Sequence, residues 1–228
     1  MSCLIQRIRT SNARRDSYKS MEPFTKQMIH NDIVQDIIRG EYRHNGLLSE
    51  RQLMEKYGTS KSVVREALVE LCNEKVLRSI PRYGYEIVTL TESDVRNILQ
   101  FRVMVECQSL PIIFKNASPE EFSELVAHTQ DTILSDDQDV WDSWDENSKF
   151  HLQLQAISGN HYCYNQIKQS LSILKRAYAQ FYWDKWHRIR FHFDSETHLR
   201  IAKALQAGDL GLAVRLLEED INSFGIAL

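Results

Sequence analysis

The sequence lacks the features that mark membrane, secreted and disulfide-stapled proteins. None of its apolar runs approaches the about 18 residues of a transmembrane helix, and the basic first twenty residues lack the apolar segment of a secretory signal. Its four cysteines are widely spaced without a CxxC pair, which indicates free thiols in a reducing compartment. These absences predict a cytoplasmic protein with no membrane partner.

Signature motifs of enzymes are absent as well. The 228 residues contain no HExxH, no GxSxG and no phosphate-binding P-loop. The length suits two domains, and 43% hydrophobic with 26% charged residues is the composition of a globular protein. We therefore expect a protein that is not an enzyme.

Charge is distributed unevenly along the chain. Residues 1–20 carry five basic side chains against one acidic side chain, and residues 21–90 carry ten of each. Since the net charge of the chain is −3, residues 91–228 hold all of the acidic excess. This pattern is compatible with an anionic partner at the N-terminal end only, and residues 1–21 are expected to form a flexible basic arm.

The N-terminal part predicts a helix-turn-helix. Apolar residues recur with a helical period between residues 24 and 39. Ser49 is expected to cap a second helix over residues 50–57, and Ser60 to cap a third. The buried face of that third helix is marked by Val64, Ala67, Leu68 and Leu71. A short turn containing Gly58 joins the second and third helices, as in a helix-turn-helix.

A basic hairpin is predicted to follow the third helix. Residues 77–80 and 85–88 read as two short strands, and residues 81–84 form the turn between them. A hairpin in this position is typical of the wing of a winged helix-turn-helix.

The third helix exposes a basic face opposite its apolar one. Lys61, Ser62 and Arg65 lie there, and two cations with a hydroxyl suit guanine edges and phosphates in a DNA groove. The alternative is an amphipathic core helix whose basic face is only solvated. The ordered combination of helices and basic wing favours DNA binding.

These segments resemble the GntR family of transcription regulators. The resemblance is carried by residues 37–40, 48–53, 60–68 and 81–84, and the stretch Val64-Arg65-Glu66-Ala67-Leu68 is its most specific part. It implies a winged helix-turn-helix domain over residues 22–90 that binds double-stranded operator DNA. The family positions that approach DNA are here Arg51, Ser60, Lys61, Ser62, Arg65, Arg82, Tyr83 and Gly84.

The match departs from the family pattern at three positions. The family usually has arginine where Lys61 stands, proline where Val63 stands, and a proline before Gly46. Lysine is a point donor rather than a bidentate fork, so we expect looser base readout at that position.

Residues 91–228 are predicted to be entirely helical. Thr91 with Asp94 has the spacing of a capping box, and Ser118 with Glu121 opens the next helix. Six helices are expected, beginning near residues 91, 118, 140, 162, 195 and 210. The predicted fold class is therefore mainly α, with an N-terminal winged helix-turn-helix followed by an all-α six-helix bundle.

This bundle resembles that of the FadR-like branch of the family, whose C-terminal FCD domain binds an effector and pairs two subunits. The matching phrases are Phe101-Arg102 with Glu106, Phe150-His151 and Thr197-His198-Leu199. The resemblance implies a homodimeric regulator, a repressor, that responds to an organic or sugar acid. It covers roughly residues 25–225.

Many members of this branch bind a divalent metal in the bundle. The corresponding positions here are Asn147, His151, His198 and Asp220, where asparagine replaces the usual aspartate and Asp220 replaces a histidine. Imidazole and carboxylate ligands suit zinc, nickel or manganese. Two interpretations stay open: a cation with two nitrogen and two oxygen ligands, or a metal-free pocket in which both histidines only form hydrogen bonds.

Arg102 matches a family arginine that faces the effector, and a guanidinium there suits a carboxylate ligand. A salt bridge to Glu106, one helical turn on, is the equal alternative.

Two other functions remain as alternatives for the whole chain. One is a helical metal-dependent hydrolase that uses His151, His198 and Asp220, and the other is an interaction module that has lost DNA binding.

Overall fold

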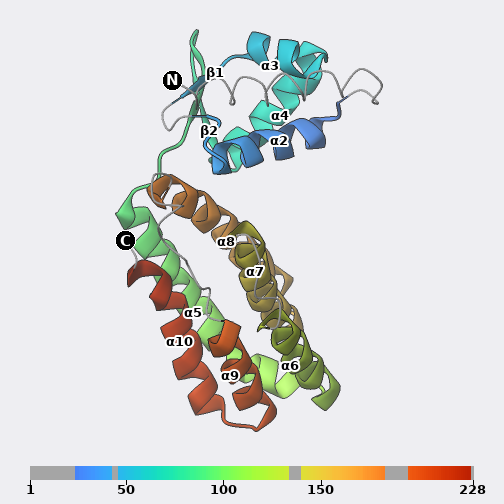
Figure 1. Cartoon of the computed structure of the whole chain (residues 1–228), viewed down its shortest axis with the longest axis vertical. Coiled ribbons are helices and arrows are strands. Elements are labelled where there is room, and N and C mark those ends of the chain that lie inside the picture. The colour runs from blue at the N-terminus through green and yellow to red at the C-terminus, as the bar shows by residue number, and fades with distance from the viewer. Residues whose placement is uncertain (1–23, 43–45, 134–139, 183–194, 227–228) are drawn as a thin grey trace, which may run out of the picture. The chain divides into compact units, whose positions relative to one another are not determined.

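The computed structural model describes residues 24–42, 46–133, 140–182 and 195–226 (Figure 1). The chain divides into two compact units, one made of Met1–Ile37 with Glu41–Val88 and the other of Ile38–Gly40 with Thr89–Leu228. Each unit has a hydrophobic core of its own. The predicted arm, residues 1–21, lies outside the described residues.

The N-terminal unit is a winged helix-turn-helix. Its elements are α2 (Lys26–Ile38), β1 (Leu47–Leu48), α3 (Glu50–Tyr57), α4 (Lys61–Asn73), β2 (Leu77–Ile80) and β3 (Gly84–Ile87). The apolar faces of the three helices meet in one core, to which Ile33, Leu53 and Leu68 contribute. The strands form an antiparallel sheet in the order β1-β3-β2.

Local signals set the ends of these helices as the sequence predicts, with one exception. The Ser49 hydroxyl accepts a hydrogen bond from the Gln52 amide at 3.2 Å, and Gly58 ends α3 in the left-handed conformation at φ 59°. Ser60 does occupy the N-cap position of α4, but its side chain makes no capping hydrogen bond. The expected cap at Ser60 is therefore wrong in this respect.

The sheet also contains a strand that the sequence does not predict. Leu47 and Leu48 form β1, in which Leu48 pairs with Tyr85 of β3. Two residues are too few to show an alternating pattern, so only the pairing with β3 reveals the strand. The second wing strand begins at Gly84, one residue earlier than expected.

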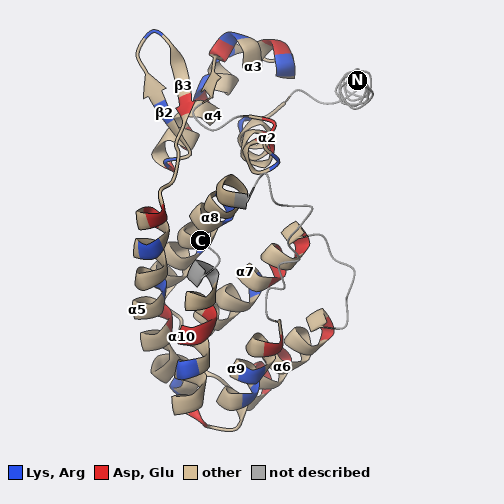
Figure 2. Ribbon diagram, turned by 60° about the vertical axis from the view of Figure 1, so that its left-hand side comes forward, with Lys and Arg blue, Asp and Glu red and all other residues tan. Residues whose placement is uncertain are grey.

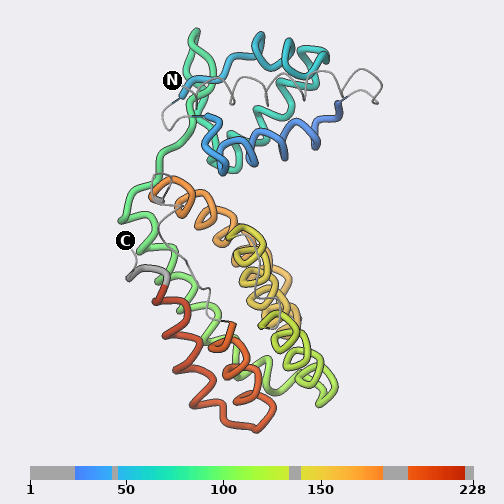
Figure 3. Tube along the Cα trace, in the orientation of Figure 1, coloured from blue at the N-terminus to red at the C-terminus, as the bar shows by residue number. Residues whose placement is uncertain are grey.

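The C-terminal unit is a helical bundle, and its described residues contain six helices and no strand. They are α5 (Glu92–Asn116), α6 (Pro119–Ile133), α7 (Val140–Ile157), α8 (His161–Tyr182), α9 (Ser195–Gln206) and α10 (Leu210–Ile226). Figures 1 and 3 show α10 lying along α5, α9 beside both α10 and α6, and α7 against α8. The predicted fold class is confirmed.

Both predicted N-terminal signals of the first two bundle helices are present. The Asp94 amide donates to Thr91 Oγ1 while Asp94 Oδ2 accepts from the Thr91 amide, so the two residues form a complete capping box. Ser118 and Glu121 exchange the same pair of hydrogen bonds at the start of α6. Apolar side chains such as Leu110, Phe150 and Leu217 are then fully or almost fully buried between the helices.

The segment that leads into α5 is fixed to the bundle by one side chain. The Gln180 amide on α8 accepts from the Leu90 backbone N–H at 2.8 Å and donates to the Leu90 carbonyl at 2.6 Å.

None of the described helices combines the length and the hydrophobicity that a membrane-spanning helix needs.

Candidate DNA-binding surface and effector site

The predicted DNA-binding residues lie on the exposed surface around the start of α4 and at the wing tip. Lys61 and Arg65 occupy the first two turns of α4, and each side chain is 62% exposed. Arg51 on α3 is 89% exposed and forms an ion pair with Glu55 at 3.0 Å. Figure 2 shows that acidic and basic residues alternate along α3.

Glu50, the first residue of α3, joins the two cations of α4. Its Oε2 lies 3.3 Å from Lys61 Nζ and its Oε1 lies 3.2 Å from Arg65 Nε. The Tyr85 hydroxyl of β3 also donates to Glu50 Oε1, at 3.3 Å. The sequence alone does not indicate this role of Glu50, because its partners come from other elements of the fold.

The wing tip is a tight turn with an unusual residue in it. The Tyr83 amide donates to the Ile80 carbonyl at 3.0 Å, and Arg82 adopts φ 71° at the third position of this turn. A positive φ at that position normally favours glycine, so an arginine there is strained by about 1–2 kcal/mol. Tyr83 is 73% exposed, and the turn therefore presents a cation and an aromatic ring to solvent.

Gly84 has a steric role in the same hairpin. Its φ is 126°, and a Cβ atom at this position would lie 2.4 Å from the Leu48 carbonyl oxygen. Only glycine therefore fits where β3 passes β1. The structure thus explains Gly84 by packing, without assigning it a DNA contact.

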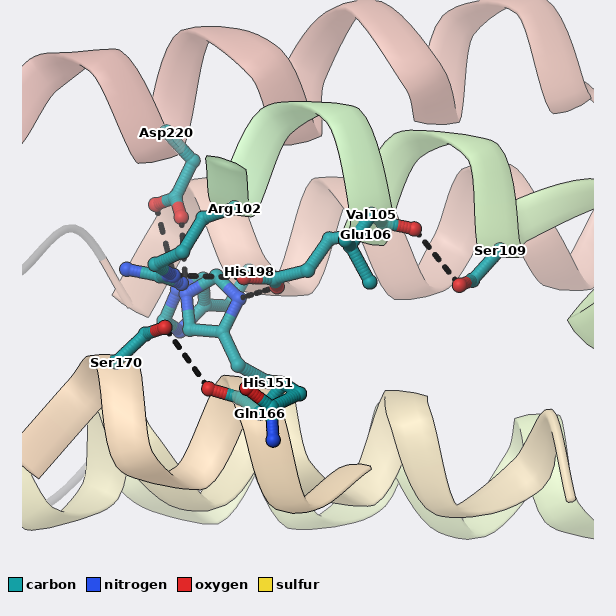
Figure 4. A network of polar contacts seen from close by, with 9 residues as sticks. All are labelled: Arg102, Val105, Glu106, Ser109, His151, Gln166, Ser170, His198 and Asp220. Carbon is teal, nitrogen blue, oxygen red and sulfur yellow. Dashed lines mark hydrogen bonds and ion pairs between the residues drawn. The ribbon is translucent and has the colours of Figure 1, made fainter. Parts of the chain in front are cut away.

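The second site lies inside the bundle, where three of the four predicted metal ligands meet (Figure 4). Asp220 of α10 places its Oδ2 3.2 Å from His151 Nε2 of α7 and its Oδ1 3.3 Å from His198 Nε2 of α9. All three side chains are at least nine-tenths buried. Among the described residues, these three form a group that could hold a metal ion.

Two side chains of α5 extend this cluster. His151 Nδ1 donates to Glu106 Oε2 at 2.7 Å, and Arg102 Nε donates to Glu106 Oε1 at 2.7 Å. Of the two interpretations of Arg102, the salt bridge to Glu106 is formed. Arg102 also lies beside the cluster, and its contact with an effector stays a prediction. The sequence predicts Glu106 only as a partner of Arg102, whereas its contact with His151 joins residues 45 positions apart.

Mutual ion pairing dominates the charge states of the cluster. Burial raises the pKa of the Asp220 carboxyl, but His198 and His151 outweigh this effect and hold the pKa well below its usual range. Burial lowers the pKa of His151, and Glu106 with Asp220 reverses the shift, so that the pKa is raised overall. Both imidazole nitrogens of His151 thus face carboxylates.

Asn147, the fourth predicted ligand, lies at a hollow next to the cluster. It lines this hollow between α6, α7 and α9 together with His128, Glu146 and His198. The Phe150 ring stacks on the His198 imidazole with centroids 4.1 Å apart and fixes the plane of the imidazole. His198 therefore borders both the buried cluster and the hollow.

The donor atoms of the cluster fit a divalent cation. The ligand atoms of His151, His198 and Asp220 all lie within 4.8 Å of one another. Ligands that bind a tetrahedral ion at about 2.0–2.2 Å stand roughly 3.4 Å apart, close to the two carboxylate–imidazole distances seen here. Two imidazoles with one carboxylate also form a donor set that zinc and related ions accept.

Unpaired polar atoms lie on two of the helices that carry the cluster, α5 and α7. Within the described residues, Arg102 Nη2 and both amide atoms of Gln155 are buried without a hydrogen-bond partner. Gln155 follows His151 by one turn of α7. Buried polar atoms of this kind cost about 1–3 kcal/mol each when they stay unpaired, so they are places where a polar ligand or water would be stabilised.

Comparison with known proteins agrees with both halves of this description. The model of bacterial regulatory proteins of the gntR family matches residues 25–87, and the FCD domain model matches residues 97–223. The chain belongs to the gntR family. It is therefore a DNA-binding transcriptional regulator and not an enzyme, which confirms the predicted class and removes the hydrolase alternative.

Curated relatives of this gntR regulator carry regulatory names. The HTH-type transcriptional repressor GlaR of Escherichia coli is 26% identical over 153 residues, which are 65% of this chain and 69% of that protein. The gluconate operon transcriptional repressor of Bacillus licheniformis is 32% identical over 90 residues, 40% of this chain and 35% of that protein. Repressors are thus present among the relatives.

The fold is shared with solved structures of other proteins. The structure named E. coli McbR/YncC superposes with a TM-score of 0.67 at 18% identity, and covers 89% of this chain and 95% of that chain. This likeness supports the mainly-α architecture of winged helix-turn-helix and helical bundle.

Proposed function

We propose that this gntR regulator is an operator-binding repressor that a small carboxylate effector, an organic or sugar acid, controls through the bundle. The observation that carries the proposal is the buried cluster of His151, His198 and Asp220 with Arg102 beside it. Charged groups are costly to bury even when they are paired, so a cluster of this kind marks a place where a bound ligand or ion would be stabilised.

A divalent cation, zinc, nickel or manganese, would be held by His151, His198 and Asp220. When bound, it would supply a Lewis acid with open positions for an effector oxygen. Glu106 accepts the Nδ1 proton of His151, which directs the Nε2 atom toward Asp220. Asn147 would add an amide oxygen from the side of the hollow.

Arg102 would bind the effector's carboxylate with the part of its guanidinium that Glu106 does not use. Its Nε is engaged by Glu106, while its Nη2 is buried without a hydrogen-bond partner among the described residues. The gluconate operon repressor among the relatives supports a sugar acid as the effector class.

On the DNA side, Arg51, Ser60, Lys61, Ser62, Arg65, Arg82 and Tyr83 would contact the operator, with Gly84 shaping the wing. One recognition helix covers only a short half-site, so the repressor would act as a homodimer on a palindrome. It would do so in the cytoplasm, where an operator is accessible.

Metal content and thermal stability test the bundle part of this proposal. The protein is dialysed against zinc, nickel or manganese, its metal content is determined by elemental analysis, and its melting temperature is then followed with a panel of organic and sugar acids. We expect near-stoichiometric metal, and an acid that raises the melting temperature.

The matched variants are His151→Ala, which removes a proposed ligand, and His161→Ala at the exposed start of α8. Metal should be lost only from the first variant. Near-zero metal in the wild-type protein would contradict the cation, and the histidines would then act as hydrogen-bond partners of an acid.

A further inference from the structure

We infer that Glu50 is a positioning residue for DNA reading, which holds the Arg65 and Lys61 side chains in the orientation that meets the groove. The inference rests on the proposed DNA contacts of these two cations. Glu50 Oε1 lies 3.2 Å from Arg65 Nε, and Glu50 Oε2 lies 3.3 Å from Lys61 Nζ. A single carboxylate thus holds both cations of the recognition helix, one on each oxygen.

The geometry leaves the DNA-binding end of Arg65 available. Guanine is read by two parallel hydrogen bonds from an arginine to its O6 and N7 atoms. Because Glu50 faces Nε, at the inner edge of the guanidinium, the terminal nitrogens of Arg65 need not give up this contact. The acid therefore orients the arginine without occupying the atoms that would read the base.

Glu50 is itself held in place, which a positioning group requires. Its side chain is 20% exposed, whereas the two cations are each 62% exposed. The Tyr85 hydroxyl of β3 donates to Glu50 Oε1 at 3.3 Å, and burial raises the pKa of Tyr85, so this donor stays protonated. Glu50 also starts α3, where the helix dipole stabilises a carboxylate.

An acid on a DNA-binding face weakens nonspecific attraction to phosphates, so it must act through specificity. A free arginine side chain loses up to about 2 kcal/mol of rotamer entropy when it is fixed on DNA. An arginine that is already oriented loses less of this entropy on binding. Glu50 would thus raise the preference for the operator over other DNA.

Glu55 is the matched control on the same helix. It carries the same charge and also pairs with an arginine through Nε, that of Arg51 at 3.0 Å. Both of these side chains are largely exposed, and within the described part of the chain no other element forms an ion pair with them. Such solvated pairs contribute little. A variant at Glu55 therefore reports the effect of charge alone.

The experiment measures the affinity of the full-length protein for its operator and for a nonspecific duplex of equal length, by fluorescence anisotropy at several salt concentrations. We expect Glu50→Ala to lower the ratio of the two affinities about 10-fold, within the range that one arginine–guanine contact provides. Glu55→Ala should change the ratio less than about twofold. Glu50→Gln, which removes the same charge but keeps an acceptor oxygen, should recover part of the loss.

A double-mutant cycle separates positioning from other roles. In an Arg65→Ala background, Glu50→Ala should cause no further loss of discrimination beyond the share due to Lys61, since the arginine it orients is absent. An undiminished loss in that background would overturn the inference and assign Glu50 a direct contact with a base. Equal effects of Glu50→Ala and Glu55→Ala would overturn it too, because charge alone would then explain both.

The proposed DNA contacts themselves have a separate readout. If Arg65→Ala alone leaves operator affinity unchanged, the contact of Arg65 fails, and the inference fails with it. If Arg65→Ala weakens operator binding while Glu50→Ala does not, only the inference fails. Should Glu50→Ala not fold, Tyr85→Phe removes one support of the carboxylate and should lower discrimination about threefold; no change in this variant would overturn the inference.

Discussion

The buried ion pair of Arg102 and Glu106 gives a sharp test of how the bundle is held together. In the structure, Arg102 Nε and Glu106 Oε1 are 2.7 Å apart, and the two side chains are 4% and 0% exposed. Replacing arginine by methionine keeps most of the apolar stem but removes the charge. Arg102→Met therefore leaves the Glu106 carboxylate inside the bundle, where His151 is its remaining partner among the described residues (Figure 4).

The size of the effect follows from that geometry. Removing one partner of a buried ion pair costs about 3–5 kcal/mol, because the other charge stays buried and unpaired. His151 still donates to Glu106 at 2.7 Å, so we expect the lower end, about 3 kcal/mol. For a protein of this size that free energy corresponds to a fall in melting temperature of roughly 6–12 °C.

The effect should depend on pH in a defined direction. Burial raises the pKa of Glu106, but Arg102 and His151 outweigh it and hold the pKa below its ordinary value. The wild-type carboxylate therefore adds stability above the unfolded pKa of about 4.3, and this contribution is lost as the pH falls through the lower folded pKa. Without Arg102 the pKa of Glu106 rises, so the difference between the two proteins should be largest near neutral pH and shrink toward about pH 4.

Thermal unfolding followed by circular dichroism at neutral and mildly acidic pH measures both quantities. The double variant Arg102→Met/Glu106→Leu should recover most of the loss, because neither charge then remains buried. A fall of less than about 1 °C for Arg102→Met at neutral pH would refute the reasoning.

Three further predictions concern the rest of the chain. Arg65→Ala should weaken operator binding by about 1–3 kcal/mol and relax the preference at one base position per half-site, as measured by anisotropy with single-base operator variants. Gly84→Ala should destabilise the N-terminal unit by about 3 kcal/mol in urea unfolding, because the new Cβ would lie 2.4 Å from the Leu48 carbonyl oxygen at a φ of 126°. The control Gly211→Ala should not destabilise the protein, because a Cβ there meets only ordinary contacts. Gln180→Ala should lower the melting temperature of the bundle by an amount equivalent to about 1–2 kcal/mol, because it removes two hydrogen bonds to the segment before α5. An unchanged melting temperature would contradict this prediction.

Periodicity and turn residues were enough to predict most of the N-terminal unit. The apolar spacing of α4, the cap at Ser49 and the glycine at position 58 are local signals, and each acts in the structure as the sequence suggests. Strand β1 was missed because two residues carry no pattern of their own. The cap at Ser60 was overpredicted because residue type indicates that a cap is possible, but does not fix the side-chain rotamer.

The candidate sites, too, were predicted only in part. The metal-ligand positions came from a resemblance to a family, and three of them, His151, His198 and Asp220, do converge. The contacts of Glu50 with α4 and of Glu106 with His151 were not predicted, because an acidic side chain in a helix is normally interpreted as solvated surface. Their partners come from other elements, as the contact between Glu106 and His151 shows, and only the folded chain brings them together.

The measurement that tests the central claim most directly is operator affinity with and without an acid that binds the bundle. Operator fragments are selected from genomic DNA by the purified protein, and their dissociation constants are determined by anisotropy over a titration of the acid that raises the melting temperature most. If the bundle controls DNA binding, a saturating acid should change operator affinity about 5–150-fold, the usual range of coupling between two sites. The His151→Ala variant should still bind the operator, but the acid should no longer change its affinity. An acid that binds the wild-type bundle tightly but leaves operator affinity unchanged would contradict the claim.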